Sequence, residues 1–107
     1  MNIPGIGNLQ KQVQKMQEDM LKLQEKLDAE RLETASGGGM VKVTTSGMGE
    51  VLEIKIAPEV VDPNDVQMLE DLVVTAVRDA LKKAQEHHTE QMSAVTGGLA
   101  GKLPLGF

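Results

Sequence analysis

The 107-residue sequence contains no cysteine, no tryptophan and no tyrosine, and Phe107 is its one aromatic residue. Without cysteine the protein has no disulfides, no thiol chemistry and no cysteine-ligated zinc site. Without a set of aromatic side chains it lacks a surface on which single-stranded bases could stack. The apolar residues are mainly Val, Leu, Ile, Ala and seven Met. They predict a thin core that a second subunit would help to complete.

The sequence also lacks any run of about 18 apolar residues, so it predicts no membrane-spanning helix. Residues 1–12 have no basic segment followed by an apolar one, which argues against a secretory signal. The absence of cysteine suits a reducing cytoplasm. The net charge is −5. This value disfavours a polyanionic partner only weakly, because net charge says nothing of how charges are distributed.

Three consecutive glycines, Gly37 to Gly39, are compatible with either a phosphate-binding loop or a hairpin turn. A phosphate loop requires a helix start behind it and a Lys–Ser/Thr pair that reaches the anion. Here the next residues are MVKVTT, which alternate with period two and are rich in β-branched side chains. The glycines are therefore predicted to form a turn between strands.

The chain predicts a single domain, residues 1–107, of the α+β class. A first helix is expected from Asn8 to about Glu30, because this segment lacks Pro and Gly and is rich in good helix formers. Strand and turn signals fill residues 31–57 and indicate a three-stranded antiparallel meander with one apolar face. A second helix is expected from about Val66 to about Val95. The ends expected to be mobile are a leader, residues 1–7, and a Gly-rich tail, residues 97–107.

The first helix carries an apolar seam with the 4-3-4-3-4 spacing of a coiled coil. At about 100° per residue the six seam residues fall within roughly 80° of one another. The small sheet cannot cover both this seam and the apolar stripe of the second helix. A second copy of the chain is the simplest cover for the remaining apolar surface. The predicted dimer interface consists of Leu9, Val13, Met16, Met20, Leu23 and Leu27.

Two basic groups are candidate contacts for DNA phosphates. The first is a stripe on the first helix, about 22 Å long at 1.5 Å per residue; the second lies on the second helix. A solvated helix face is the alternative for the first group, since Glu18 and Glu25 lie at spacings that allow pairing with Lys22. The two groups are Lys11, Lys15, Lys22 and Lys26, and Arg78, Lys82 and Lys83.

Catalytic and metal constellations are not supported by the sequence. His87 and His88 are adjacent on a helix and point about 100° apart, whereas a helical zinc pair needs a spacing of about four residues. Neighbouring carboxylates such as Glu70 and Asp71 likewise do not share a face for acid–base work. We therefore expect no enzyme activity, no small-molecule substrate, no cofactor and no metal.

Three segments together resemble the YbaB/EbfC family of bacterial nucleoid-associated proteins. They are GNLQKQVQKMQEDMLKLQEKL (7–27), GGGMVKVTTSGMGEVLEIKIAPEVV (37–61) and MLEDLVVTAVRDALKKAQE (68–86). The resemblance spans nearly the whole chain, and MLEDLVVTAVRDA is its most specific part. It implies an α-β-β-β-α subunit and an intertwined homodimer with projecting helical arms. Arg78 stands where the family often has Asn, and Ala57 where it often has Asp, so sequence preference does not transfer.

Two function classes follow. The resemblance implies a non-enzymatic protein of the cytoplasm and nucleoid that binds double-stranded DNA and affects nucleoid organisation and gene expression. Because no recognition helix of Arg, Asn and Gln is evident, we expect contacts mainly to phosphates and weak base readout. The alternative is a coiled-coil adaptor, chaperone-like, that clamps a protein between its arms. The acidic net charge and the Met-containing seam favour this second class.

Overall fold

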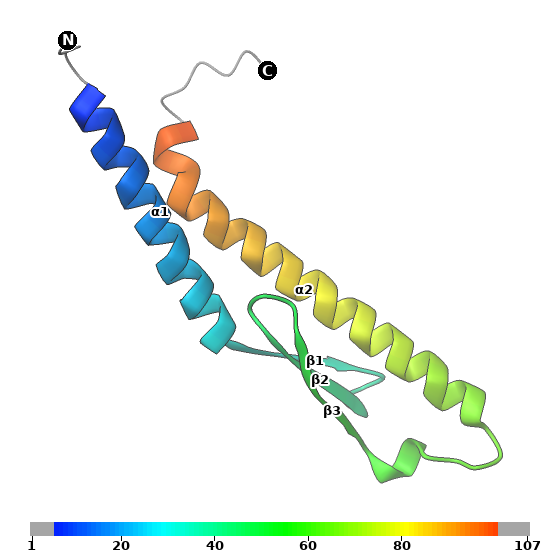
Figure 1. Cartoon of the computed structure of the whole chain (residues 1–107). Helices are drawn as coiled ribbons and strands as arrows, with labels where there is room; N and C mark the ends of the chain where they lie inside the picture. The colour runs from blue at the N-terminus through cyan, green and yellow to red at the C-terminus, as the bar shows by residue number, and fades with distance from the viewer. Residues whose placement is uncertain (1–5, 101–107) are drawn as a thin grey trace.

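The computed structural model describes residues 6–100, in the order helix, three strands, helix (Figure 1). The strands form one antiparallel sheet in the order β1-β2-β3. This arrangement confirms the predicted α-β-β-β-α subunit of the α+β class. The elements are α1 (Ile6–Ala29), β1 (Arg31–Ser36), β2 (Val41–Ser46), β3 (Val51–Ile56), a short 3-10 helix η1 (Pro58–Val60) and α2 (Val66–Ala100).

Each long helix is longer than predicted at one end, α1 at its N-terminus and α2 at its C-terminus. α1 begins at Ile6 rather than Asn8, and α2 continues beyond Val95 through two glycines to Ala100. Adding a residue to an existing helix is much easier than starting one, so a glycine at the end of a long helix is tolerated. Residues 1–5 of the expected leader and residues 101–107 of the expected tail lie outside the described residues.

The glycine triplet forms the turn of the β1–β2 hairpin, as predicted. Gly37, Gly38 and Gly39 have φ angles of 62°, 70° and 88°. These are left-handed conformations that glycine adopts without steric cost. Strand pairing continues on both sides of the turn, with Ser36 opposite Val41.

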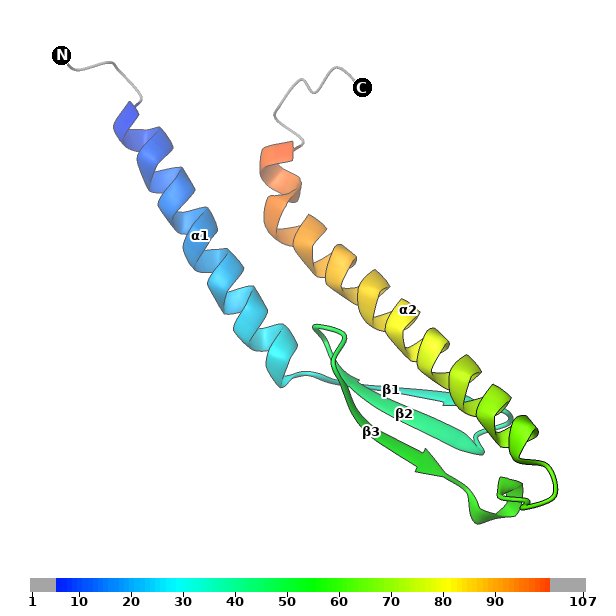
Figure 2. The same ribbon diagram turned by 45° about the vertical axis from the view of Figure 1, so that its right-hand side comes forward.

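The core lies between α2 and the face of β1 and β2 that it covers. Val41 and Val43 of β2 are fully buried, and they pack against Ala76 and Ala80 of α2. Alanines at these positions allow the helix axis to approach the sheet closely, since a small side chain needs little space between two packed elements. The sheet is thus fixed beneath the first half of α2 (Figure 2).

The third strand is not covered in the same way. Every residue of β3 is exposed, including Ile54 and Ile56, which are each 39% exposed. These two residues pair with Val43 and Val41 and so share the apolar face of the sheet. α2 packs on β1 and β2 instead. One chain therefore leaves part of its apolar sheet face open to solvent.

Beyond the sheet, α1 and α2 lie side by side as two arms. The N-terminal end of α1 and the C-terminal end of α2 are at the same end of the molecule, far from the sheet (Figures 1 and 2). The C-terminal part of α1 is the firmly packed part, because among residues 7–29 the buried side chains begin at Leu23. The subunit is thus a small α/β base with projecting helices.

Candidate nucleic-acid interface

The apolar seam of α1 is divided into a docked half and a free half. Leu23 and Leu27 are 6% and 0% exposed within one chain, whereas Leu9 and Val13 are 61% and 55% exposed. Met16 and Met20 are half-buried. Leu23 and Leu27 are thus already covered by their own subunit, so the part of the predicted dimer interface left open to a partner lies toward the N-terminal end.

The docked half is held by a close approach between α1 and the β2–β3 turn. The backbone N–H of Gly47 donates to the Leu27 carbonyl over 2.8 Å. A Cβ atom at position 47 would lie 2.8 Å from that carbonyl oxygen and 2.9 Å from Leu27 Cδ2. Only glycine fits here without displacing α1. The sequence shows Gly47 as a turn residue but gives no sign of this contact.

The lysine stripe on α1 is exposed along its whole length. Within the described residues, Lys11, Lys15 and Lys22 take part in no ion pair, so the pairing of Lys22 with Glu18 or Glu25 that the solvated-face alternative invoked is not formed. Lys26 differs, because its ammonium lies 3.8 Å from Glu30 Oε1 and donates to Gln91 Oε1 over 3.5 Å. Three unpaired ammonium groups therefore line the free part of α1.

The basic residues of α2 separate into two kinds. Arg78 and Lys82 are exposed, and no ion pair in residues 6–100 includes them. Lys83 points toward the sheet, and its Nζ donates to the Glu33 carbonyl of β1 over 2.8 Å. Lys83 therefore helps to hold α2 on β1, which leaves Arg78 and Lys82 as the free cations of this group.

The two basic groups are not brought together in one chain. Lys26, at the docked end of the stripe, contacts Gln91, whereas Lys83 lies over β1. The stripe therefore runs beside the distal half of α2, and the second group lies over the sheet. A DNA-binding surface that contains both groups would have to extend from α1 to the part of α2 that lies over the sheet.

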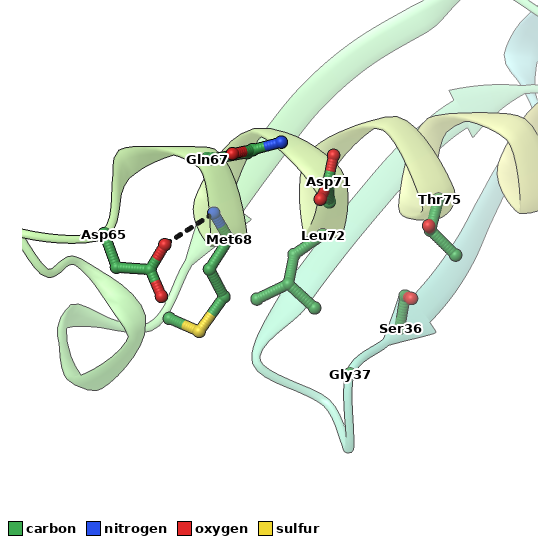
Figure 3. Close-up of a pocket in the computed structure, with 8 residues that line it drawn as sticks. All are labelled: Ser36, Gly37, Asp65, Gln67, Met68, Asp71, Leu72 and Thr75. Atoms are coloured by element: carbon green, nitrogen blue, oxygen red, sulfur yellow. Dashed lines mark hydrogen bonds between the residues drawn. The ribbon is translucent and has the colours of Figure 1, made fainter.

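A hollow of about 580 Å³ lies beside the glycine turn and the first turns of α2 (Figure 3). Asp65 caps α2, since its Oδ1 accepts from the Met68 N–H over 3.2 Å. With Asp71 it places two carboxylates at the hollow, and these would repel a phosphate. The hollow is lined by Ser36, Gly37, Asp65, Gln67, Met68, Asp71, Leu72 and Thr75.

Replacing Gly38 by Val is expected to reduce the free energy of unfolding by about 1–2 kcal/mol, because position 38 has a φ of 70°. A Cβ here would meet no atom within 4 Å, so the effect comes from the backbone alone. The matched control is Gly38→Asn, which tolerates this conformation better. Urea denaturation measures both. Equal stability of the Val variant and the wild type would show that the turn does not require glycine at this position.

The adjacent histidines have separate surroundings, as their spacing predicts. His87 Nε2 forms a short contact with Glu30 Oε2, and His88 lines a different hollow with Met48 and Leu81. Among the described residues, no group of three or more His, Asp or Glu side chains is arranged to hold a metal ion. The link between His87 and Glu30 joins positions 57 apart, which no sequence motif indicates.

No helix in the described part of the chain is long and apolar enough to cross a membrane.

The subunit is an elongated α+β protein with a small α/β base and projecting helices, and α1 exposes Lys11, Lys15 and Lys22 without an ion pair in residues 6–100. The model of the YbaB/EbfC DNA-binding family matches residues 1–99. The chain belongs to this family, which confirms the resemblance seen in the sequence.

Similar proteins support the assignment. A nucleoid-associated protein of Acetivibrio thermocellus is 51% identical over 102 residues, covering 92% of this chain and 90% of that protein. One from Desulforamulus reducens is 53% identical over 95 residues, covering 89% and 90%. The crystal structure of an uncharacterized protein, HP0035, from Helicobacter pylori is similar in fold, with a TM-score of 0.68 and 26% identity. That likeness covers 84% of this chain and 91% of that one.

Proposed function

We propose that the chain is a nucleoid-associated protein that binds duplex DNA as a homodimer, mainly through phosphates, and so affects nucleoid organisation and gene expression. The observation that carries this proposal is the exposed, unpaired set of Lys11, Lys15 and Lys22 on one face of α1. Membership of a DNA-binding family and relatives named nucleoid-associated proteins support it.

The chemistry of the stripe favours phosphate contact over base readout. An ammonium group is a compact point charge that attracts any phosphate, and binding it releases condensed counterions from the duplex. Base readout needs side chains such as Arg, Asn or Gln placed in the major groove. The stripe offers only lysines, which span about 16 Å from Lys11 to Lys22 at 1.5 Å per residue. We infer that the protein binds many duplex sequences alike.

The open apolar surface supports a homodimer. Ile54 and Ile56 of β3 are each 39% exposed, and Val74 and Leu81, seven residues apart on one flank of α2, are 48% and 41% exposed. Small soluble proteins rarely leave such a surface uncovered. A second copy that covers β3 would also double the number of lysine stripes. We propose that the interface includes β3 and this flank of α2, together with the free half of the α1 seam.

Light scattering coupled to size exclusion is expected to give twice the 11.5 kDa mass of one chain. Replacing Ile54 by Lys should shift the protein to the monomer, because a buried, unpaired charge is strongly unfavourable at an interface. Met16→Lys tests the α1 seam in the same way. The matched control is Glu53→Lys, which places a cation on the other side of the same strand. A wild-type monomer at micromolar concentration would contradict the dimer.

Fluorescence anisotropy with labelled DNA tests the binding proposal directly. Duplexes of unrelated sequence should bind with affinities within a few fold of one another, and a single strand of the same length should bind more weakly. The expected difference follows from the lower charge density of a single strand and the lack of aromatic residues for stacking. Strong preference for one duplex sequence would contradict phosphate-dominated binding.

A protein-clamping adaptor is the second candidate, favoured by the exposure of Leu9 and Val13 on the projecting part of α1. An apolar arm of this kind would contact protein rather than phosphate. Under this alternative, DNA affinity would not respond to the charge of the stripe.

A further inference from the structure

Four polar side chains join the base of α1 to α2. The carboxylate of Glu30 contacts the Lys26 ammonium through one oxygen, at 3.8 Å, and His87 Nε2 through the other. Lys26 also donates to Gln91 Oε1 over 3.5 Å. His87 and Gln91 lie four residues apart on α2 and so share a face. We name this group, Lys26, Glu30, His87 and Gln91, the arm-base clamp.

The clamp lies where α1 stops being packed. Glu30 and His87 have side chains only 24% and 25% exposed, so their contact is better shielded from water than a surface ion pair. Leu27, next to Lys26 in the sequence, is buried, and its carbonyl accepts a hydrogen bond from the Gly47 N–H. On the other side, toward the N-terminus, α1 carries Val13 and Leu9 in exposed positions. Within one subunit the base of α1 is therefore fixed, and the N-terminal half, which the proposed dimer would cover along its apolar seam, projects from that base.

Small rotations at this base produce large displacements of the stripe. From Leu27 to Lys11 the helix rises about 24 Å at 1.5 Å per residue, so a rotation of about 10° moves Lys11 by about 4 Å. Successive phosphates are separated by about 3.4 Å along the axis of one DNA strand. A loose base would therefore let the lysines shift by a whole phosphate position.

We propose that the arm-base clamp is a positioning device that fixes the angle of α1 against α2 and thereby preorganises the lysine stripe for duplex DNA. Its residues need not touch DNA. Preorganisation raises affinity because less conformational freedom is lost on binding. The proposal rests on the proposed DNA-binding function, but it also makes a prediction about the free protein.

The DNA test depends on whether the affinity for duplex DNA rises or falls. Replacing Glu30 by Gln removes a negative charge, which by long-range electrostatics alone would tighten binding to phosphate. Loss of the clamp predicts the opposite, a severalfold weaker affinity. The matched control is Glu25→Gln, the same change on an exposed residue of α1 that joins no ion pair within residues 6–100. Glu25→Gln should tighten binding slightly.

The structural test measures the spacing of the arms without DNA. Since the chain has no cysteine, spin labels at Gln14→Cys and Ser93→Cys on exposed positions of α1 and α2 report this spacing. Refolding labelled chain with a large excess of unlabelled chain restricts the distances to one subunit. His87→Gln should broaden the distance distribution and weaken DNA binding, whereas the neighbouring His88→Gln should change neither.

Broadened distances together with weaker binding in Glu30→Gln and His87→Gln would support the clamp. Unchanged distances in both variants would overturn it, whatever happens to DNA affinity. Tighter DNA binding by Glu30→Gln, equal to that of Glu25→Gln, would also overturn it. If the wild type does not bind duplex DNA at all, the proposed function fails, while the distance measurement still decides whether the clamp fixes the arm.

Discussion

Replacement of Lys15 and Lys22 by Glu is expected to lower duplex-DNA affinity on the order of 10³-fold at 0.1 M salt. Each lost phosphate contact reduces the slope of log K against log salt by about 0.9, which corresponds to about eightfold at this concentration. Two contacts per subunit become four in a dimer. Both lysines are exposed and off the apolar seam, so the dimer and its melting temperature should not change. Anisotropy titrations with light scattering check both parts.

The opposite change provides the control for this prediction. Glu18 and Glu25 lie on α1 close to the stripe but do not pair with Lys22 in the structure. Replacing both by Gln should tighten duplex binding for all sequences, because it removes repulsion of phosphate beside the stripe. An adaptor would show no systematic response to either pair of changes. If both double variants bind DNA as the wild type does, the stripe is a solvated face.

Replacing Leu27 by Ala is expected to reduce the free energy of unfolding by about 2–5 kcal/mol. Leu27 is fully buried within one chain, and truncating a buried leucine loses transfer free energy and leaves a cavity. The effect should appear in urea denaturation as a lower midpoint. The control is Leu21→Ala on the same helix, because Leu21 is 62% exposed. That change should alter the unfolding free energy by no more than about 0.5 kcal/mol.

The same experiment separates the packing of the subunit from its assembly. The heptad spacing predicts Leu27 as a dimer contact, whereas the structure packs it beside Gly47. Replacing a residue of the subunit core lowers the free energy of unfolding at every protein concentration. Replacing a residue that contributes only to the dimer interface lowers stability by an amount that depends on protein concentration. If Leu27→Ala weakens dimerisation and leaves the unfolding of a dilute monomer unchanged, the heptad interpretation is correct for this residue.

The fold was predictable because its signals are local. Period-two alternation in MVKVTT and the glycine triplet before it suffice for a hairpin. The alanines of α2, spaced by four, mark the face that packs on the sheet, and Ala76 and Ala80 are indeed buried there. The ends of helices were less predictable, since extending an existing helix to Ile6 or Ala100 changes the free energy little compared with starting a helix.

The candidate site was predictable only as a pattern of faces. Helical spacing places the lysines on one side of α1, but it does not show which of them is engaged elsewhere. Lys26 is held by Glu30 and Gln91, and Lys83 by the Glu33 carbonyl. These contacts join positions 50 to 65 residues apart in the sequence, apart from the local Lys26–Glu30 pair. They depend on how the elements pack, which one sequence does not reveal.

The salt dependence of duplex binding by the wild-type protein is the most direct test of a DNA-binding dimer with a lysine stripe. Log K should fall linearly with log salt, with a slope of about −3 to −5. Six ammonium groups, those of Lys11, Lys15 and Lys22 in two subunits, would give about −5 if all contact phosphates, at about 0.9 per contact. Duplexes of different sequence should give the same slope. A slope shallower than about −1, or no binding at low salt, would contradict phosphate contact by the stripe.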